Sequence, residues 1–124
     1  MTQVIYPTHT CFDDALDLAT GLVREDRRRA VTLRVVHGIV HPYDKPFAHA
    51  WLEAGAQVFF CGIQDGEKRV FQISRSEYYA EILVLECTRY TLGHALRLNR
   101  QTGHYGPWTA QYRALCRQGE SHAQ

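Results

Sequence analysis

The chain has 124 residues, the length of a single domain on the usual scale of roughly 100–200 residues. Its 14 Lys and Arg residues nearly balance 13 Asp and Glu residues. This balance argues against a nucleic-acid partner, because nucleic-acid-binding proteins carry a basic excess on one surface. Hydrophobic residues make up 45% of the chain and charged residues 22%, which excludes a disordered protein.

The sequence also gives expectations about the compartment. No apolar run approaches the roughly 20 residues of a membrane-spanning helix, and the first residues lack the basic start and apolar core of a signal peptide. The cysteines show no CxxC spacing, so we expect reduced thiols in a cytoplasmic protein with no membrane association. The four cysteines are Cys11, Cys61, Cys87 and Cys116.

The first predicted element is an amphipathic helix from Cys11 to about Arg24. Its apolar residues recur with the i, i+3, i+4, i+7 spacing of one helix face. Thr10 is a suitable N-cap, and Asp13 and Asp14 place negative charge in the first turn. The charged segment 24–29 is expected to form an exposed helix end and loop, with a phosphate site as the alternative.

Three strands are predicted next. Residues 30–40 are rich in β-branched side chains and are apolar on both faces, as in a central, doubly covered strand. The two prolines of the 41–46 segment predict a loop. Residues 47–53 and 57–63 form the second and third strands, joined by Ala54-Gly55-Ala56 as a three-residue hairpin loop.

The rest of the chain alternates between strands and helices. Asp65-Gly66 is a hairpin signal, Ser74 to Glu77 fits a capping box, and Gly103 is a natural helix end. The further predicted elements are a strand at 69–73, a helix after Ser74, a strand at 82–90, a helix from Thr91 to Gly103, a turn at 104–108 and a helix at 109–117. This order predicts an α+β fold, with an antiparallel sheet packed against an N-terminal helix and C-terminal helices.

Cys11 and His49 form the candidate catalytic pair. At a helix start the backbone N–H groups and the helix dipole favour a thiolate, the form of cysteine that attacks carbonyl groups. A histidine on a following strand can act as the base for such a nucleophile. We therefore expect Cys11 to be the most reactive thiol. The alternative is that Cys11 is a small buried hydrophobic residue and His49 a packed strand residue.

The residues around this pair resemble a known superfamily. Thr10 to Leu16, Val36 to Gly38 and His49 to Glu53 are similar to the papain-like/transglutaminase-like cysteine hydrolases, and more narrowly to small bacterial and phage-associated proteins of that type. Arg89 to Thr91 and Gly103 to Trp108 add to the resemblance, which spans about residues 10 to 108. It implies a papain-like fold and hydrolysis or acyl transfer on an amide or thioester of a small-molecule, peptide or protein substrate.

The resemblance also implies an Asp on the next strand that orients the histidine. With a three-residue loop, Trp51 lies opposite Phe59 and His49 lies opposite Cys61. Cys61 thus occupies the position expected for the Asp. Asp65 takes that role only if the chain folds back; otherwise it serves the hairpin turn.

The absence of this Asp leaves a second functional hypothesis open. On it, the protein is a catalytically degenerate binding module with the same fold. Cys61 in place of the acid supports it, as do aromatic side chains expected to be exposed near Tyr43, Tyr105 and Trp108.

The environment of His49 can be predicted from strand alternation. Trp51 is two residues away on the same face, so it is expected to pack beside His49, line the site and keep it dry, which lowers the pKa of the imidazole. Glu53 on that face is expected to reach solvent at the hairpin end. His37 is expected to line the pocket beside Cys11 or to pack within its strand.

A metal site is an alternative for the same residues. Cys11, His49 and Cys61 carry side chains that suit zinc. No spacing in the chain resembles a zinc finger, so neither a metal nor another cofactor is expected.

Overall fold

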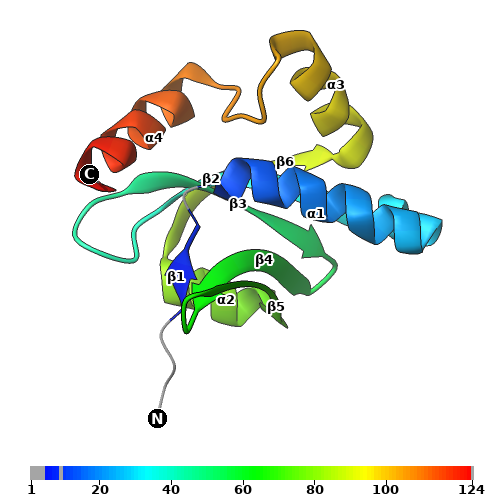
Figure 1. Cartoon of the computed structure of the whole chain (residues 1–124), viewed down its shortest axis with the longest axis horizontal. Coiled ribbons are helices and arrows are strands. Elements are labelled where there is room, and N and C mark those ends of the chain that lie inside the picture. Colours follow the sequence, from blue (N-terminus) through cyan, green and yellow to red (C-terminus); the bar gives the residue numbers. More distant parts are fainter. Residues whose placement is uncertain (1–4, 9, 124) are drawn as a thin grey trace.

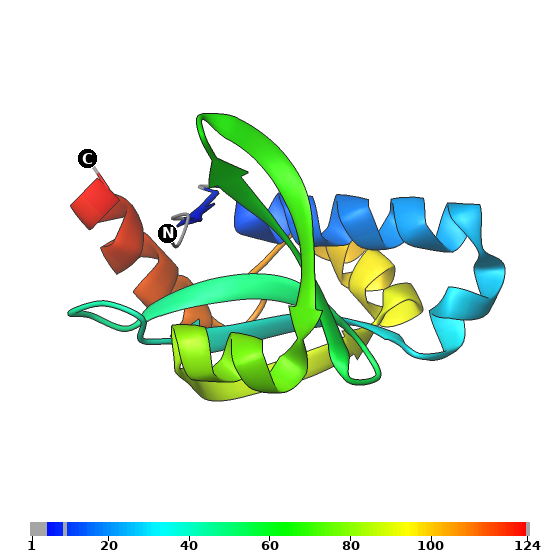
Figure 2. The ribbon, with the colours of Figure 1, turned by 90° about the horizontal axis from the view of Figure 1, so that it is seen from below.

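The computed structural model describes residues 5–8 and 10–123, and for residues 6, 7 and 117–123 the backbone only. In this part of the chain an antiparallel sheet of six strands lies between two layers of helices (Figures 1 and 2). The α+β class and the antiparallel sheet predicted from the sequence are confirmed. The strands are β1 (Tyr6–Pro7), β2 (Leu33–Val40), β3 (Phe47–Ala54), β4 (Gln57–Gln64), β5 (Glu67–Ser74) and β6 (Val84–Thr91). The helices are α1 (Cys11–Glu25), the short 3₁₀ helix η1 (Arg27–Val31), α2 (Arg75–Ile82), α3 (Leu92–Thr102) and α4 (Ala110–Ala123).

The strand order positions the candidate site. The strands run β1-β4-β3-β2-β6, and β5 pairs with β4. β2 pairs with β3 along its whole length, whereas β4 pairs with β3 only from Leu52 to Ala54. Beyond that point the β4–β5 hairpin turns away from β3 (Figure 2). The start of β3, Phe47 to Trp51, is therefore free of β4, and α1 packs against β3.

Two hydrophobic cores fill the two sides of the sheet. We call these sides the α1 face and the α2 face. The α1 face also carries α3 and α4, and its buried core includes Phe12, Leu16, Val35, Leu52, Tyr90 and Tyr112. The α2 face is built around Val36, Val40, Trp51, Val58 and Tyr78. β2 contributes to both cores, which confirms the prediction of a doubly covered central strand.

The β3–β4 hairpin corrects the predicted strand register. Its turn has two residues, Gly55 and Ala56, because Ala54 pairs with Gln57. Gly55 has φ of +61°, as the first central residue of a type II′ turn requires. Leu52 rather than Trp51 therefore lies opposite Phe59. A shift of one residue moves side chains to the other face of the sheet, so the predicted pairing of His49 with Cys61 is wrong.

Most local signals in the sequence are confirmed. Ser74 accepts a hydrogen bond from the Glu77 N–H at the start of α2, and Thr91 accepts one from the His94 N–H at the start of α3. Gly103, with φ of +77°, ends α3.

One capping bond and one strand start differ from prediction. Thr10 makes no capping hydrogen bond at the start of α1; its hydroxyl donates to the Asp14 carboxylate instead. The predicted strand 30–40 begins at Leu33, because Asp26 caps η1 by accepting from the Arg28 N–H.

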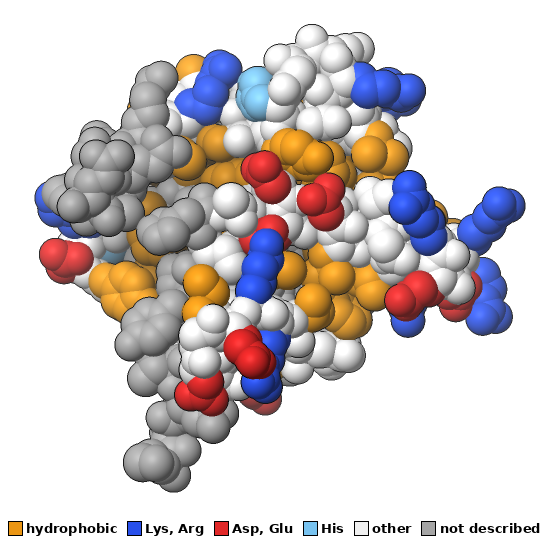
Figure 3. Space-filling view, viewed as in Figure 1, with side chains coloured by type: hydrophobic (Ala, Val, Ile, Leu, Met, Phe, Trp, Pro, Cys, Tyr) orange, Lys and Arg blue, Asp and Glu red, His pale blue; other side chains and the backbone are white. Residues whose placement is uncertain are grey.

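The charged segment at the end of α1 is exposed, as predicted. The side chains of Arg27, Arg28 and Arg29 are in contact with solvent, and basic side chains project from this end of the molecule at the right of Figure 3. Arg28 pairs with Asp26 and Arg29 with Glu25. Within residues 5–8 and 10–123, no helix combines the length and the apolar character needed to cross a membrane.

Candidate functional site

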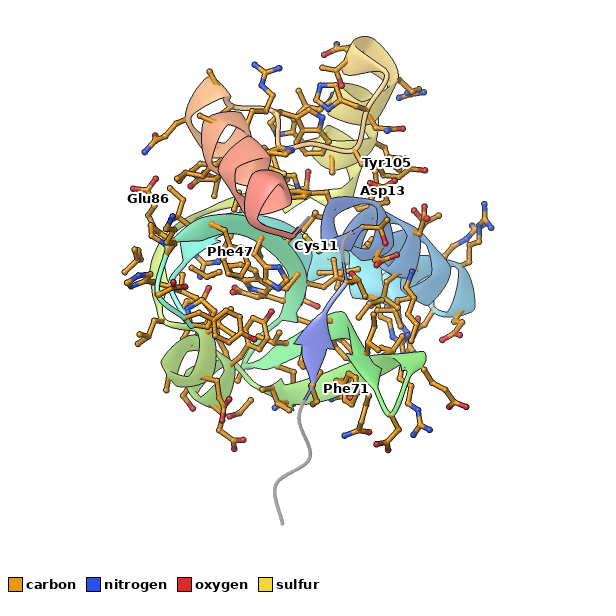
Figure 4. All side chains as sticks on the ribbon, turned by 60° about the vertical axis from the view of Figure 1, so that its left-hand side comes forward. Cys11, Asp13, Phe47, Phe71, Glu86 and Tyr105 are labelled. Atoms are coloured by element: carbon orange, nitrogen blue, oxygen red, sulfur yellow. The ribbon has the colours of Figure 1, made fainter. Side chains whose placement is uncertain are left out.

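Cys11 is the first residue of α1 and is half-buried (Figure 4). Burial raises the pKa of its thiol to about 12. The backbone N–H of Ala50, and to a smaller extent that of Phe12, lowers the pKa, while Cys116 and Asp14 raise it further. The sulfur therefore lies beside the stretch of β3 that β4 leaves unpaired. The predicted thiolate is wrong for the resting protein, because loss of hydration outweighs the helix start.

His49 lies on β3, one residue before Ala50. Side chains alternate along a strand, so His49 points toward the α2 face while Ala50 belongs to the core of the α1 face. The imidazole is 7% exposed, and burial lowers its pKa to about 4. At neutral pH it is therefore an uncharged base.

Aromatic rings flank His49 along its strand. Its ring centroid is 6.1 Å from that of Phe47 and 5.9 Å from that of Trp51. Trp51 is completely buried. The expectation that Trp51 packs beside His49 in dry surroundings is confirmed.

Tyr78 of α2 is a residue of the site that the sequence analysis missed. Its hydroxyl lies 3.0 Å from Nε2 of His49. Burial raises the pKa of Tyr78 well above its ordinary value, and a thiolate at Cys11 would raise it further, so Tyr78 is within electrostatic reach of Cys11. The sequence indicated a helix here, but not the side of the sheet that it covers.

Cys61 does not lie beside His49. It alternates with Phe60, which packs on the α2 face, so its side chain belongs to the α1 face. Burial raises the pKa of Cys61, Asp14 raises it further and Lys68 lowers it. Cys61 is therefore a neighbour of the acidic first turns of α1, and it does not occupy the place of an acid beside His49.

The neighbours of Cys61 form a polar cluster around Asp14. The Asp14 carboxylate accepts hydrogen bonds from Thr8 at 2.7 Å and Thr10 at 2.9 Å, and it pairs with Lys68 of β5. Burial alone would raise the pKa of Asp14, but these partners hold it below its ordinary value. The cluster fastens the N-terminal segment and the β4–β5 hairpin to the start of α1.

His37 is packed within the sheet and does not line an opening. It is 0% exposed, and its ring lies 4.7 Å from Phe12, 5.2 Å from Tyr90 and 4.8 Å from Trp108 between ring centroids. Neither ring nitrogen has a hydrogen-bond partner among the described residues. Burial lowers the pKa of His37 to about 3. Of the two alternatives for His37, the packed strand residue is confirmed and the pocket-lining one is wrong.

Asp65 belongs to the β4–β5 turn. Asp65 and Gly66 have φ of +54° and +78°, as the two central residues of a type I′ turn require. This is the hairpin role that the sequence analysis gave as the alternative to orienting His49.

Glu53 is buried, contrary to the prediction that it reaches solvent. It is 3% exposed and accepts hydrogen bonds from Trp51 Nε1 at 3.0 Å, from Tyr79 Oη and from Arg89 Nε at 2.8 Å. Burial alone would raise the pKa of Glu53, but these donors hold it below its ordinary value. Glu53 thus links β3 to α2 and β6 on the same face as His49.

The zinc alternative has no support from the geometry. Among the residues that the structure describes, no three His, Cys, Asp or Glu side chains are grouped so that they could hold a metal ion.

Comparison of this chain with known proteins finds no relative. No protein-family model matches the chain, and neither the curated proteins nor the solved structures contain a significant match.

Proposed function

We propose that this protein is a cysteine-dependent hydrolase or acyltransferase, in which Cys11 is the nucleophile and His49 the general base. The observation that carries the proposal is the position of the Cys11 sulfur. It lies at the start of α1, beside the backbone N–H of Ala50, the residue that follows the buried, uncharged His49. Cys11, which packs on the α1 face, and His49, which points to the α2 face, thus border the same short stretch of β3, and we place the proton transfer at the strand edge that β4 leaves unpaired.

The chemistry is a two-step acyl transfer. The sulfur attacks the carbonyl carbon of an amide or thioester, the thiol proton passes to His49, and the leaving amine or thiol departs with that proton. Water or a second acceptor then releases the acyl group and restores the thiol. The substrate proposed is a small molecule or peptide that carries such a bond.

The electrostatics of the site favour proton transfer during the attack. Both partners are neutral at rest, because burial raises the pKa of Cys11 to about 12 and lowers that of His49 to about 4. A preformed thiolate–imidazolium pair is therefore not the starting state. The N–H groups of Ala50 and Phe12, which already favour negative charge on the sulfur, are suited to stabilise the oxygen of the tetrahedral intermediate.

The arrangement of elements supports a papain-like/transglutaminase-like fold as part of this proposal. A helix that begins with the cysteine packs against an antiparallel sheet, and a central strand of that sheet carries the histidine. The departure from the pattern of that superfamily is that the hydrogen-bond partner found for His49 among the described residues is the phenol of Tyr78 and not an acid.

Acylation by a small thioester tests the proposal. The protein is incubated with S-phenyl thioacetate at pH 7.5, and the acetylated cysteine is identified by mass spectrometry of peptides. We expect Cys11 to be acetylated faster than the other thiols, and His49→Gln to slow this reaction by about 10²-fold or more, as loss of a general base does. Cys61→Ser is the matched control and should leave the rate unchanged. Acetylation spread evenly over the cysteines, or unaffected by His49→Gln, would overturn the proposal.

The binding-module hypothesis is the second candidate. It is favoured by the raised pKa of the Cys11 thiol and by Tyr43, which is 60% exposed beside Phe47 (ring centroids 6.5 Å apart). On this hypothesis Cys11 reacts no faster than Cys61 with the thioester, and Cys11→Ser leaves the stability of the protein nearly unchanged.

A further inference from the structure

His37 lies in an enclosure of aromatic rings and makes no hydrogen bond there. Its imidazole is 0% exposed, and neither Nδ1 nor Nε2 has a partner among the described residues. The rings of Phe12, Tyr90 and Trp108 surround it, and Trp108 is stacked on the imidazole at 4.8 Å between ring centroids. The backbone of Gly106 also lies against it, since a Cβ atom there would stand 2.6 Å from Cε1 of the imidazole. Buried polar groups are normally paired, so an imidazole with two unpaired nitrogens requires an explanation.

One wall of this enclosure is a turn at the surface. Phe12 of α1 and Tyr90 of β6 are each 6% exposed and belong to the buried core of the α1 face. Trp108 and Gly106 belong to residues 103–108, in the link between α3 and α4 at the top of Figure 1. We call this segment the α3–α4 turn. Most of it is in contact with solvent.

Few hydrogen bonds fasten the α3–α4 turn to the rest of the protein. Within the turn, Trp108 Nε1 donates to the backbone oxygen of His104 at 3.2 Å, and side chains at the end of α3 donate to the same oxygen. Among the described residues, the hydrogen bond that joins the turn to an element other than α3 runs from Tyr105 to Asp17 of α1, at 3.4 Å. The turn is otherwise attached by packing, so it can lift from His37 while the sheet and the helices stay in place.

We propose that His37 and the α3–α4 turn form an acid-sensitive latch, in which the turn must lift and admit water before the imidazole can take up a proton. The latch does not depend on the proposed function. In the closed state, burial lowers the pKa of His37 from 6.5 to about 3. In the lifted state the wet imidazole titrates near its ordinary value.

The expected response to pH follows from this difference. Below pH 6.5 the lifted state binds a proton that the closed state does not bind. The equilibrium constant for lifting the turn should therefore rise about 10-fold per pH unit as the pH falls from 6.5 toward 3, and should be constant above pH 6.5.

Most other titratable groups on the elements around His37 keep their charge between pH 7 and pH 5. α1 contributes Cys11, β6 contributes Tyr90 and α4 contributes Tyr112, and thiols and phenols hold their protons in this range. Asp17, which accepts from the turn, carries a carboxyl group, and carboxyl groups titrate mainly below pH 5.

Two other histidines are close enough to need controls. His94 of α3 lies 5.4 Å from Tyr90 between ring centroids. His104 is part of the turn, and its Nδ1 accepts a hydrogen bond from the Gly106 N–H at 3.1 Å. Protonation of His104 would remove that acceptor, so its contribution must be separated from that of His37.

Hydrogen exchange of the two tryptophan indole N–H groups tests the latch. The exchange rates, measured by NMR between pH 7 and pH 5 and divided by the intrinsic rates, give an opening constant for each indole. Trp108 reports on the turn. Trp51 is completely buried and donates to Glu53, so it reports on unfolding of the whole protein. We expect the opening constant of Trp108 to exceed that of Trp51 at every pH, and to rise about 10-fold per pH unit below pH 6.5.

Three variants assign the response. His37→Leu should make the opening constant of Trp108 independent of pH. His94→Gln and His104→Gln are the controls and should retain the wild-type dependence on pH, whatever their effect on the opening constant at pH 7.

Several results would overturn the latch. Equal opening constants for Trp108 and Trp51 would show that the turn opens only when the whole protein unfolds. An opening constant of Trp108 that does not change between pH 6.5 and pH 5, or one that still changes in His37→Leu, would remove His37 from the response. If His37→Leu does not fold, the remaining variants decide, because a response lost in His94→Gln or His104→Gln belongs to that histidine and not to His37.

Discussion

The indole ring of Trp51 on β3 lies directly against the backbone of Gly38 on β2. A Cβ atom at position 38 would stand 2.7 Å from Cη2 of Trp51, 2.8 Å from the backbone oxygen of Glu86 and 3.1 Å from Cβ of Cys87. Trp51 itself is completely buried. The contact shows that the core of the α2 face depends on the absence of a side chain in the middle of the sheet.

We therefore predict that Gly38→Ala destabilises the protein by about 1–3 kcal/mol, the usual cost of overpacking a core. The free energy of unfolding in urea measures the effect. Gly21→Ala in α1 is the matched control: nothing lies within 4 Å of the added Cβ, and the exchange should stabilise the helix by up to about 1 kcal/mol. Equal stabilities for Gly38→Ala and the wild type would show that Trp51 moves aside without cost.

Glu53→Gln should lower the free energy of unfolding by about 2 kcal/mol at pH 7, in the range for hydrogen bonds to charged groups. The amide still accepts from one donor, but the ion pair with Arg89 at 2.8 Å is lost. Because the pKa of Glu53 is lowered in the folded protein, its stabilisation is present above its ordinary value of 4.5 and is lost as pH falls through the folded-state pKa. The deficit of the variant should therefore shrink in acid.

The control for Glu53 is Glu67→Gln. Glu67 also pairs with an arginine, Arg69 at 2.8 Å, but both side chains are at least half exposed. Its loss should change stability by less than about 0.5 kcal/mol. A similar loss in both variants would mean that burial does not strengthen the Glu53 pairs.

Acid should destabilise the protein through its two buried histidines. Burial lowers the pKa of His37 to about 3 and that of His49 to about 4, from 6.5. Below pH 6.5 the unfolded chain binds protons that the folded protein does not bind, so stability is constant above this pH and falls below it. With both histidines contributing, the slope should approach about 2.7 kcal/mol per pH unit near pH 5. Urea unfolding at a series of pH values measures it.

His37→Leu separates the two contributions. It removes one imidazole from an entirely apolar site, so the slope near pH 5 should fall to about half. Stability that stays constant from pH 7 to pH 4.5 in the wild-type protein would contradict the burial of both rings.

Leu83→Gly should leave the protein as stable as the wild type or stabilise it by up to about 1 kcal/mol. Leu83 follows α2 with φ of 50° and ψ of 76°, a left-handed conformation that costs an L-residue roughly 1–2 kcal/mol. Its side chain is 52% exposed, so little packing is lost. The gain is partly offset by the greater freedom of glycine in the unfolded chain. Thermal unfolding measures the difference.

Leu85→Gly is the matched control, two residues further along in β6. It is 61% exposed but has no left-handed backbone to relieve, so it should lose about 0.5–1 kcal/mol. If both variants lose the same amount, the backbone at Leu83 is not strained.

The sequence by itself determined most of the local structure. Ser74, Thr91 and Gly103 mark helix ends, and Asp65-Gly66 marks a hairpin turn, because hydrogen bonds and backbone angles within a few residues decide these features. The surroundings of His49 were also predictable, since residues two apart in a strand share a face.

The register of β3 and β4 was not predictable. β3 is apolar on both faces, so a two-residue and a three-residue loop both bury hydrophobic side chains. The two-residue turn places Val58 in the core of the α2 face and Phe59 against the core of the α1 face, and this register moved Cys61 away from His49.

The partners and the charge state of the candidate site were decided only by the tertiary structure. Tyr78 and His49 form a hydrogen bond although they are 29 residues apart in the sequence. Arg89 and Glu53 do so although they are 36 residues apart. Cys11 stands at a helix start, as predicted, yet its thiol is protonated at rest because burial removes the hydration that a thiolate needs. Contacts between distant segments and the exclusion of water arise when the helices close over the sheet, and no local pattern in the sequence encodes them.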